Sequence, residues 1–368
     1  MLLPTARQDK LVRATDLDAL SCKVCASTKG YFGEKDRFLA PLVASYKSNL
    51  QFCDGYTALS AERTLRAAFS TAKFPLINRG TFLRTRALDM VVDRFVLEQK
   101  KCQVLALGGG SDTRAFRVLE KYSQVKYMEV DFPELVKIKK LAILKLEILQ
   151  AAVGANEGID LIEVTSKEEL RDMYSDFVTE RYALVGFDLR LCSKGDKAQA
   201  AAAFLFLDPS LPTLIISECV LCYLSPGDFV GVLRFFGDFL EHPSLILFDP
   251  MSLGDGFGHS MVSNLSNRGI DLQTFQTFPT LESRQALLEE QLGFSAYLTD
   301  MAAVGGFSVP DLNWLSQEEV QRISSLEMMD EVEEITLMLR HYSLIYGEKN
   351  QRAHFPEELQ WKLQPKYK

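Results

Sequence analysis

The chain has 368 residues, a length that accommodates one large domain or two smaller ones. Hydrophobic residues make up 47% and charged residues 24% of the chain. This balance is typical of a globular protein and excludes a mainly disordered chain, a collagen-like repeat and a disulfide-stapled miniprotein. The 41 basic and 49 acidic residues give a formal net charge of −8. Because this charge offers no overall attraction to phosphate backbones or anionic lipids, we expect neither nucleic acid nor a membrane as a partner.

The sequence shows no pattern typical of a membrane span, a secretory signal or a disulfide framework. The longest apolar stretch, 211–224, is interrupted by Pro212 and Glu218, and it is shorter than the roughly 20 residues that a span needs. The first ten residues lack the apolar core of a signal peptide. Seven cysteines are an odd number in a chain with an ample core. We therefore expect a reduced, cytoplasmic protein, and we expect a monomer.

The N-terminal part of the chain is predicted to be helical. Apolar residues recur at three- and four-residue spacing in 35–48 and 60–70, and again in a stretch that ends near Gln99. We expect residues 1–100 to form an N-terminal helical segment and lid, 101–350 an α/β core with inserted lid segments, and 351–368 a C-terminal tail.

From Cys102 onward, short apolar strands alternate with helices, a pattern that predicts a mostly parallel sheet with helices on both faces. The predicted strands are 103–107, 125–130, 182–187, 213–217 and 244–248, with later ones at 295–300 and 341–347. The predicted helices are 113–121, 133–149, 196–206, 227–240, 281–291 and 317–339. Segment 159–164 is either an extra strand or an extended loop, and 250–260 and 301–310 are predicted loops.

A glycine-rich turn follows the first predicted strand. The apolar run 104–107 leads directly into Gly108, Gly109 and Gly110, and Asp112 then precedes a helix. Glycine lets the backbone turn sharply and approach a ligand closely, because no Cβ intervenes. Nucleotide-binding folds place their ligand at this position. The alternative is a plain turn between a strand and a helix.

Asp131 ends the second predicted strand, about twenty residues after the glycines. Doubly wound folds place there the acid that binds both ribose hydroxyls of a nucleotide. Asp131 also precedes Pro133, so it could instead cap the N-terminus of the next helix. The two roles can coexist.

The turn is a poor match to a dinucleotide site. The motif G-x-G-x-x-G requires glycine at position 113, where Thr113 stands. Asp112 would also bring an uncompensated negative charge against a pyrophosphate. An acid in this loop suits a ligand with a positive group, and S-adenosylmethionine carries an α-ammonium and a sulfonium. We therefore predict S-adenosylmethionine and not a nicotinamide nucleotide.

Acids also end the next two predicted strands, because Asp188 follows 182–187 and Glu218 follows 213–217. Each acid on its own could be a helix cap. Together with the glycine turn and Asp131, they predict one crevice along the carboxyl edge of the sheet, where open α/β folds bind ligands.

Two Cys-x-x-Cys pairs, Cys22–Cys25 and Cys219–Cys222, resemble halves of a metal site. They lie much farther apart than the roughly 12–20 residues that separate such pairs in a zinc ribbon. The four histidines show no metal-ligand spacing. We expect structural cysteines and no metal.

Short motifs recur in order along the chain, at 21–23, 78–84, 107–113, 129–133, 186–190, 218–223, 254–258, 324–331 and 340–342. In this order they resemble the leucine carboxyl methyltransferases, in a fungal-type or similar eukaryotic form. That family methylates the C-terminal leucine carboxylate of the protein phosphatase 2A catalytic subunit. The resemblance covers roughly residues 20–347.

The resemblance implies a class I S-adenosylmethionine-dependent methyltransferase fold, with a seven-stranded mostly parallel sheet and a helical lid. It also implies roles for eight cofactor-binding residues. Lys23 and Arg84 would reach the methionine part, and Gly108 and Gly110 would shape the glycine loop. Asp131 would hold the ribose, and Asp188 and Leu189 would frame the adenine. Glu218 would close the site beneath the methionine end.

A free α-carboxyl group has a pKa of about 3.3–3.7 and is already ionised at neutral pH. The implied reaction therefore needs positioning and exclusion of water, not a general base. Arg79 is a candidate to clamp the carboxylate, although it could be a surface arginine. Tyr223 is a candidate near the transfer point, although it could be a core aromatic residue.

Three functions are compatible with these features. The first is the protein carboxyl methyltransferase, which converts S-adenosylmethionine to S-adenosylhomocysteine without a metal and has the phosphatase C-terminal tail as its partner. The second is a small-molecule O-methyltransferase of the same fold, which would need a base near a hydroxyl group. The third is a non-catalytic module that binds S-adenosylmethionine or a phosphatase. Acids at all the strand ends argue against a degenerate site.

Overall fold

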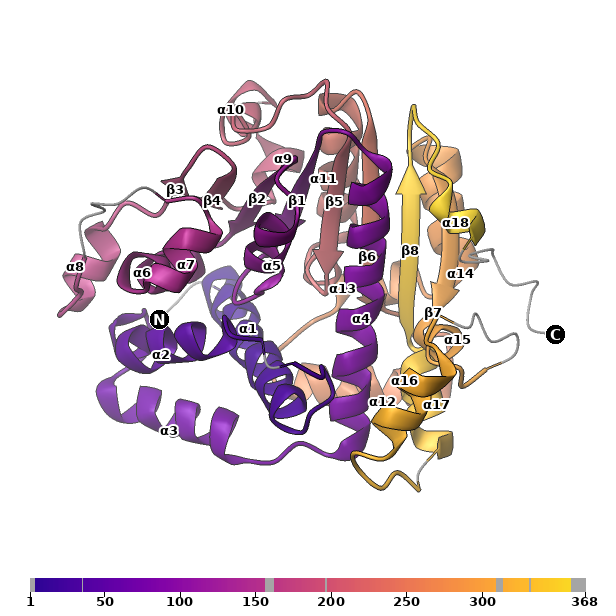
Figure 1. The fold of residues 1–368 in the computed structure, drawn as a ribbon, viewed down its shortest axis with the longest axis horizontal. Coiled ribbons are helices and arrows are strands. Elements are labelled where there is room, and N and C mark those ends of the chain that lie inside the picture. Colours follow the sequence, from indigo (N-terminus) through magenta and orange to yellow (C-terminus); the bar gives the residue numbers. More distant parts are fainter. Residues whose placement is uncertain are drawn as a thin grey trace. The chain divides into compact units, whose positions relative to one another are not determined.

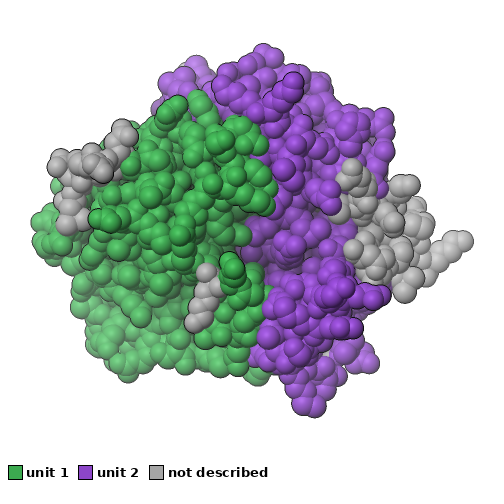
Figure 2. Space-filling model, in the orientation of Figure 1, with its two compact units in different colours: residues 1–78, 108–188 green, residues 79–107, 189–368 purple. Residues whose placement is uncertain are grey.

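The computed structural model describes residues 4–34, 36–155, 162–195, 197–308, 314–330 and 332–358. The chain forms two compact units (Figure 2). Unit 1 comprises residues 1–78 and 108–188, and unit 2 comprises residues 79–107 and 189–368. Within the described ranges, every helix is too short or too polar to cross a membrane.

Unit 1 combines N-terminal helices with three strands (Figure 1). The strands are β2 (Val125–Asp131), β3 (Phe177–Val178) and β4 (Tyr182–Gly186). The helices are α1 (Pro4–Thr28), α2 (Leu39–Asn49), η1 (Leu50–Phe52), α3 (Ala58–Ser70), α5 (Arg114–Lys121), α6 (Pro133–Lys145), α7 (Glu147–Ala152) and α8 (Lys167–Asp172).

The register of β2 against β4 positions the acids of unit 1. The two strands are parallel, and Asp131 lies opposite Gly186. The Phe187 N–H donates to the Asp131 carbonyl at 2.9 Å, which continues the ladder to the point where Asp188 follows. The carboxyl ends of β2 and β4 therefore meet at one edge, as expected for parallel strands.

The described residues of unit 2 form five strands in the order β1-β5-β6-β8-β7. They are β1 (Cys102–Leu107), β5 (Thr213–Glu218), β6 (Pro243–Pro250), β7 (Ser295–Asp300) and β8 (Tyr342–Glu348). β1, β5 and β6 are parallel, and β8 runs antiparallel to both β6 and β7. All six residues of β1 are buried, as in a strand whose two faces are covered.

The longest helix of unit 2 is α4 (Pro75–Glu98), whose first turn belongs to unit 1. Leu88, Val91, Val92 and Phe95 are buried on it and recur at three- and four-residue spacing. The later helices are α9 (Leu191–Lys194), α10 (Lys197–Ala202), η2 (Leu221–Tyr223), α11 (Pro226–Phe239), α12 (Gly256–Asn267), α13 (Gln273–Thr277), α14 (Leu281–Ala286), η3 (Leu287–Gln291), α15 (Met301–Val304), α16 (Gln317–Ser324), α17 (Val332–Arg340) and α18 (Phe355–Glu358).

All seven predicted strands are present, and the α/β class is confirmed. The structure describes eight strands. The additional one is β3, which is only two residues long and was not predicted. The helix predicted at 133–149 is wrong as one element, since Leu146 adopts an extended backbone between α6 and α7. Of the ambiguous segment 159–164, residues 159–161 lie outside the described residues, and 162–164 lie in neither a helix nor a strand.

Three other predicted elements also differ. The helix predicted at 317–339 is two helices, α16 and α17. The segment 250–260 contains the start of α12, where the Asp255 side chain accepts a hydrogen bond from the Gly258 N–H. The segment 301–310 begins with α15, where the Asp300 side chain accepts from the Ala303 N–H. Both of these helices begin at an aspartate N-cap. The cap favours a helix start, although the polar composition of each segment predicted a loop.

A buried charge network ties β2, β4 and α6 together within unit 1. The side chains of Glu129 and Lys139 are 0% and 2% exposed, and the Lys139 Nζ lies 2.7 Å from the Glu129 Oε2. The Tyr182 hydroxyl donates to the same oxygen at 2.6 Å. Burial raises the pKa of Glu129, whereas Lys139 acts in the opposite direction.

Replacement of Lys139 by methionine should strongly destabilise the fold, because Glu129 would remain buried without its cation. Breaking such a pair from one side costs about 3–5 kcal/mol. We expect a loss of this size in the free energy of unfolding, measured with urea. Lys145→Met, at an exposed position on the same helix, is the control and should change little. A Lys139→Met protein as stable as this control would show that the pair contributes nothing.

Candidate active site

The glycine turn of unit 1 has the backbone conformation that the sequence predicted. Gly108 and Gly110 have φ angles of 67° and 34°, in the left-handed region that favours glycine. The Gly108 N–H donates to the Val130 carbonyl at 2.7 Å, which fixes the start of the turn against the end of β2. A Cβ on Gly110 would lie 3.4 Å from the Asp131 Oδ2 and 2.3 Å from the Asp16 Oδ1. The turn is therefore closely lined by carboxylates.

Asp131 faces this turn and does not cap a helix. Its Oδ2 accepts from the Gly110 N–H at 2.8 Å, and its Oδ1 accepts from the Phe132 N–H at 2.7 Å. The N-cap of α6 is Phe132, which makes no side-chain cap hydrogen bond. Burial, followed by the nearby Asp16, raises the pKa of Asp131 to about 7. The helix-cap alternative for Asp131 is therefore wrong.

Asp112 is not an uncompensated charge, so the prediction that its charge would repel a pyrophosphate is wrong. The Arg114 Nη1 lies 2.5 Å from the Asp112 Oδ2, and the Lys23 Nζ lies 3.2 Å from its Oδ1. Although burial acts to raise it, the pKa of Asp112 is held well below its usual range by these cations. Asp112 binds cations of the protein itself.

Lys23 projects from α1 to this loop. Its Nζ donates to the Thr113 hydroxyl at 2.8 Å and lies 3.9 Å from the Asp36 Oδ2. The structure thus brings Lys23, Gly108, Gly110 and Asp131 together in unit 1, as the resemblance implied. Asp188 lies half-buried just after β4, next to the buried Leu189.

Asp16 is a loop-facing residue that the sequence analysis missed. Its Oδ1 accepts from the Ser111 N–H at 2.7 Å, and its Oδ2 accepts from the Ser111 hydroxyl at 2.7 Å. The buried Tyr46 hydroxyl donates to the same Oδ2. The available signal was its spacing, because Asp16 precedes Lys23 by two helical turns on one face of α1.

In unit 2, Arg84 and Glu218 form an ion pair. The Arg84 Nε donates to the Glu218 Oε1, with side chains only 28% and 19% exposed. The guanidinium lies 5.1 Å from the centre of the Phe248 ring, in a cation–π arrangement. Burial alone would lower the pKa of Arg84, but Glu218 raises it above the ordinary value. Arg84 therefore remains ionised.

The two candidate catalytic residues also lie in unit 2. Arg79 is 6% exposed and is not a surface arginine. Its Nη2 donates to the Ile323 carbonyl at 3.1 Å and contacts the Ser324 hydroxyl at 3.3 Å. Its buried Nε has no hydrogen-bond partner within the described ranges. Tyr223 is half-buried at the end of η2.

The segment after Glu218 is strained and packed. Cys219 has a φ of 56°, which is unfavourable for a residue other than glycine and is found most often at functional sites. Cys222 is 1% exposed, which confirms it as a small core residue, and Cys219 is half-buried. In the part of the chain that the structure describes, no three metal-ligating side chains form a cluster.

Arg284 and Asp249 were also missed. Arg284 is buried on α14, where its Nη2 donates to the Pro250 carbonyl at 2.6 Å and its Nη1 to the Ser343 hydroxyl at 3.0 Å. Asp249 is 1% exposed near the carboxyl end of β6. Burial raises the pKa of Asp249 to about 6, and Arg284 acts against this shift. Arg284 thus joins the ends of β6 and β8.

Comparison with known proteins agrees with this geometry. The model of the family "Leucine carboxyl methyltransferase" matches residues 12–237. "Leucine carboxyl methyltransferase 1" of Debaryomyces hansenii is 46% identical over 98% of this chain and 99% of its own length. The protein of the same name from Candida albicans is 47% identical over 95% of each chain.

A solved structure of a Thermobifida fusca protein covers 84% of this chain and 94% of its own, at 15% identity and a TM-score of 0.49. The family match and the two fungal relatives decide the assignment, and they agree with the resemblance seen in the motifs. The class I methyltransferase fold is confirmed, with eight described strands instead of seven. The chain belongs to the leucine carboxyl methyltransferase family and is a methyltransferase.

Proposed function

We propose that this enzyme transfers a methyl group from S-adenosylmethionine to the α-carboxylate of the C-terminal leucine of the protein phosphatase 2A catalytic subunit. The products are a methyl ester and S-adenosylhomocysteine. Family membership supports methylation of a protein carboxyl group. The observation that carries the cofactor assignment is the glycine turn with the Asp131 carboxylate hydrogen-bonded to Gly110.

The residues of unit 1 fit the ribose and methionine parts of S-adenosylmethionine. Each Asp131 oxygen accepts one backbone N–H, so each retains acceptor capacity for a ribose hydroxyl. Gly108 and Gly110 have no side chain between the turn and a ligand. We assign the adenine frame to Asp188 and Leu189, and the methionine carboxylate to Lys23, whose ammonium already faces this loop.

In unit 2 we assign Arg84 and Glu218 to the methionine end of the cofactor. When bound, S-adenosylmethionine supplies an electrophilic methyl group on a sulfonium. The substrate carboxylate is ionised at neutral pH, so no enzyme residue has to remove a proton. We assign Arg79 to orient the carboxylate, because its buried Nε is a donor without a partner within the described ranges, and Tyr223 to line the transfer point. Their contribution is alignment in a site shielded from water.

We further propose that residues 1–100 act as the helical segment and lid of this enzyme, that 101–350 form its catalytic core and that 351–368 form a tail, of which 359–368 lie outside the described residues. Helices α1 to α4 support the first assignment, because they account for most of that segment. We also propose a cytoplasmic monomer that uses no metal. The seven cysteines are free thiols, the state favoured by a reducing compartment.

Amidation of the substrate C-terminus should abolish methyl transfer, because an amide nitrogen cannot replace the carboxylate oxygen as nucleophile. The measurement is transfer of a radiolabelled methyl group to purified phosphatase catalytic subunit. Unmodified subunit and a subunit lacking the terminal leucine are the comparisons, and only the unmodified subunit should be labelled. Label on the amidated subunit or on an internal side chain would disprove the proposal. Label on a small molecule alone would favour the small-molecule O-methyltransferase.

Asp131→Asn should weaken binding of S-adenosylmethionine by roughly 10- to 100-fold, because one charge-assisted hydrogen bond contributes about 1.5–3 kcal/mol. Calorimetric titration measures the dissociation constant. Asp172→Asn, at an exposed position of the same unit, is the control. Unchanged affinity in Asp131→Asn would remove Asp131 from the site.

The affinity of the unmodified enzyme for S-adenosylmethionine should fall below pH 7. The pKa of Asp131 is raised to about 7 without ligand, and ribose hydroxyls donate to the ionised form, so protonation competes with binding. Affinity should be constant above pH 7 and fall by up to about tenfold per pH unit below it. Turnover with saturating cofactor should not depend on an enzyme base. A turnover number that rises through neutral pH would instead indicate a hydroxyl nucleophile.

Arg84→Gln should reduce turnover by roughly 100-fold through lost alignment, and raising the pH should not restore activity. The matched control is Arg66→Gln, because Arg66 forms an ion pair with Glu62 on the exposed surface of α3. Steady-state kinetics with both substrates provide the measurement. Full activity in Arg84→Gln would contradict the role that we assign to this pair.

A further inference from the structure

Helix α1 presents Asp16 and Lys23 to the glycine loop from the same face. Seven residues correspond to nearly two full helical turns, so the two side chains lie about 10 Å apart along the axis. Lys23 contacts Asp112 and Thr113 at the far end of the loop. Asp16 contacts Ser111, the residue directly before Asp112. The helix therefore contacts three consecutive residues, 111–113, of the loop that the proposed function assigns to the cofactor.

Two consecutive backbone amides of this loop donate to two different carboxylates. The Gly110 N–H donates to Asp131 at 2.8 Å, and the Ser111 N–H donates to Asp16 at 2.7 Å. Asp16 also accepts from the Ser111 side chain, so this residue is held through both its backbone and its hydroxyl. The Tyr46 hydroxyl from α2 donates to Asp16 as well and thereby helps to fix the carboxylate.

We propose that Asp16 is a positioning residue for the cofactor loop: by binding both donors of Ser111, it holds Gly110 in the left-handed conformation that places its N–H on Asp131. The inference rests on the proposed function, in which this loop and Asp131 bind S-adenosylmethionine. Asp16 acts on the cofactor through the loop, and Tyr46 orients Asp16. Without this carboxylate, Ser111 loses the acceptor of two hydrogen bonds, and Asp131 loses a fixed partner.

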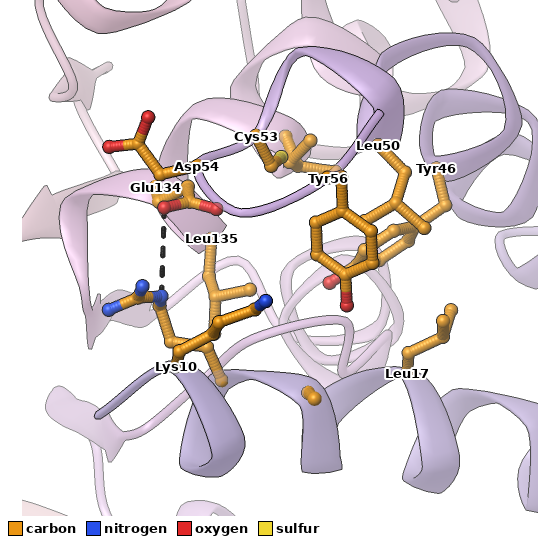
Figure 3. A pocket seen from close by; sticks show the side chains of 12 residues that line it. Lys10, Leu17, Tyr46, Leu50, Cys53, Asp54, Tyr56, Glu134 and Leu135 are labelled. Atoms are coloured by element: carbon orange, nitrogen blue, oxygen red, sulfur yellow. Dashed lines mark ion pairs between the residues drawn. The ribbon is translucent and has the colours of Figure 1, made fainter. Parts of the chain in front are cut away.

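Contacts other than those of Asp16 also hold α1 against the rest of unit 1. Three residues before Asp16, the Arg13 Nε lies 3.6 Å from the Glu134 Oε2, and the guanidinium lies 5.7 Å from the centre of the Phe132 ring. Leu17, Tyr46 and Tyr56 lie around a pocket at this contact (Figure 3). Leu17 and Leu20 are also buried. Loss of Asp16 should therefore alter the loop while α1 remains bound.

The charges around the two carboxylates predict a second effect. Asp131 faces Asp16 from α1 and Lys139 from α6, and Asp16 faces the Tyr46 hydroxyl from α2. Asp112 and Lys23 at the other end of the loop form an ion pair with each other. Because Asp16 disfavours ionisation of Asp131, removal of its charge should let Asp131 ionise at lower pH.

The test compares Asp16→Ala, Asp16→Asn and Tyr46→Phe with Asp172→Ala as the exposed control. The dissociation constant of S-adenosylmethionine is measured by calorimetry between pH 5.5 and 8.5, together with the thermal unfolding midpoint. We expect Asp16→Ala to weaken binding about tenfold or more at pH 8, and Asp16→Asn to weaken it less, since its amide oxygen still accepts from the Ser111 N–H. Asp16→Asn should also retain binding to a lower pH than the unmodified enzyme.

The possible results separate this inference from the proposed function. If the unmodified enzyme does not bind S-adenosylmethionine, the proposed function itself is wrong. If it binds and both Asp16 variants bind equally well with the same pH dependence, the positioning role is wrong. A lower unfolding midpoint with unchanged affinity would show that Asp16 only stabilises the fold. Weaker binding in Asp16→Ala with partial recovery in Asp16→Asn supports the role.

Discussion

The candidate cofactor site depends on the end of β2, where the half-buried Asp131 carboxylate is held by backbone amides and forms no ion pair within the described residues. Asp131 accepts from the N–H groups of Gly110 and Phe132. Hydrogen bonds of this kind favour the ionised carboxylate, but burial and Asp16 oppose them, so its pKa rises to about 7. A cation next to Asp131 would pair with the carboxylate and compete with a neutral ribose for it. Amide donors instead fix the position of the carboxylate and leave acceptor sites for hydroxyl groups. The glycine turn is necessary for this arrangement, because a side chain at Gly110 would collide with Asp16 and approach Asp131.

The cations near this loop are paired with other acids. Asp112 lies between Arg114 and Lys23, and the Lys139 Nζ donates to the Asp112 carbonyl and to Glu129. These contacts hold the far end of the loop and the face of β2 beneath it. The charge of Asp112 is thus paired with cations, whereas Asp16 of α1 and Asp131 of β2 accept hydrogen bonds from neutral donors at Gly110 and Ser111. A ligand with hydroxyl donors and a positive group matches these two carboxylates.

The sequence predicted the sheet better than the contacts of the site. Continuous apolar runs such as 104–107 predict buried strands, because such strands are covered on both faces. The acids that follow the predicted strands lie at the carboxyl ends of β2, β4 and β5. Short elements escaped prediction: β3 has too few residues for a pattern, and the α6–α7 break arises from one extended residue, Leu146. The compensation of Asp112 was not predictable either, since Lys23 is close to it only after α1 has packed. Asp16 was missed for the same reason. Pairing between distant segments is a property of the tertiary structure, and composition does not encode it locally.

Arg84 and Arg79 of unit 2 differ in whether an acid compensates their positive charge. Arg84 is already neutralised by Glu218 and rests on Phe248, so a substrate carboxylate that approached it would also meet the negative charge of Glu218. Arg79 makes its described hydrogen bonds to a carbonyl and a hydroxyl, which are neutral groups, so its positive charge is not cancelled by them.

An arginine of this kind suits an anionic substrate better than one in an ion pair, because binding a carboxylate then completes a charge pair instead of breaking one. The segment at Ile323 and Ser324 that Arg79 contacts would consequently influence the orientation of the substrate carboxylate. In the mechanism that we propose, Arg84 would orient the methyl donor and Arg79 the acceptor, so neither residue would need to change protonation during the reaction.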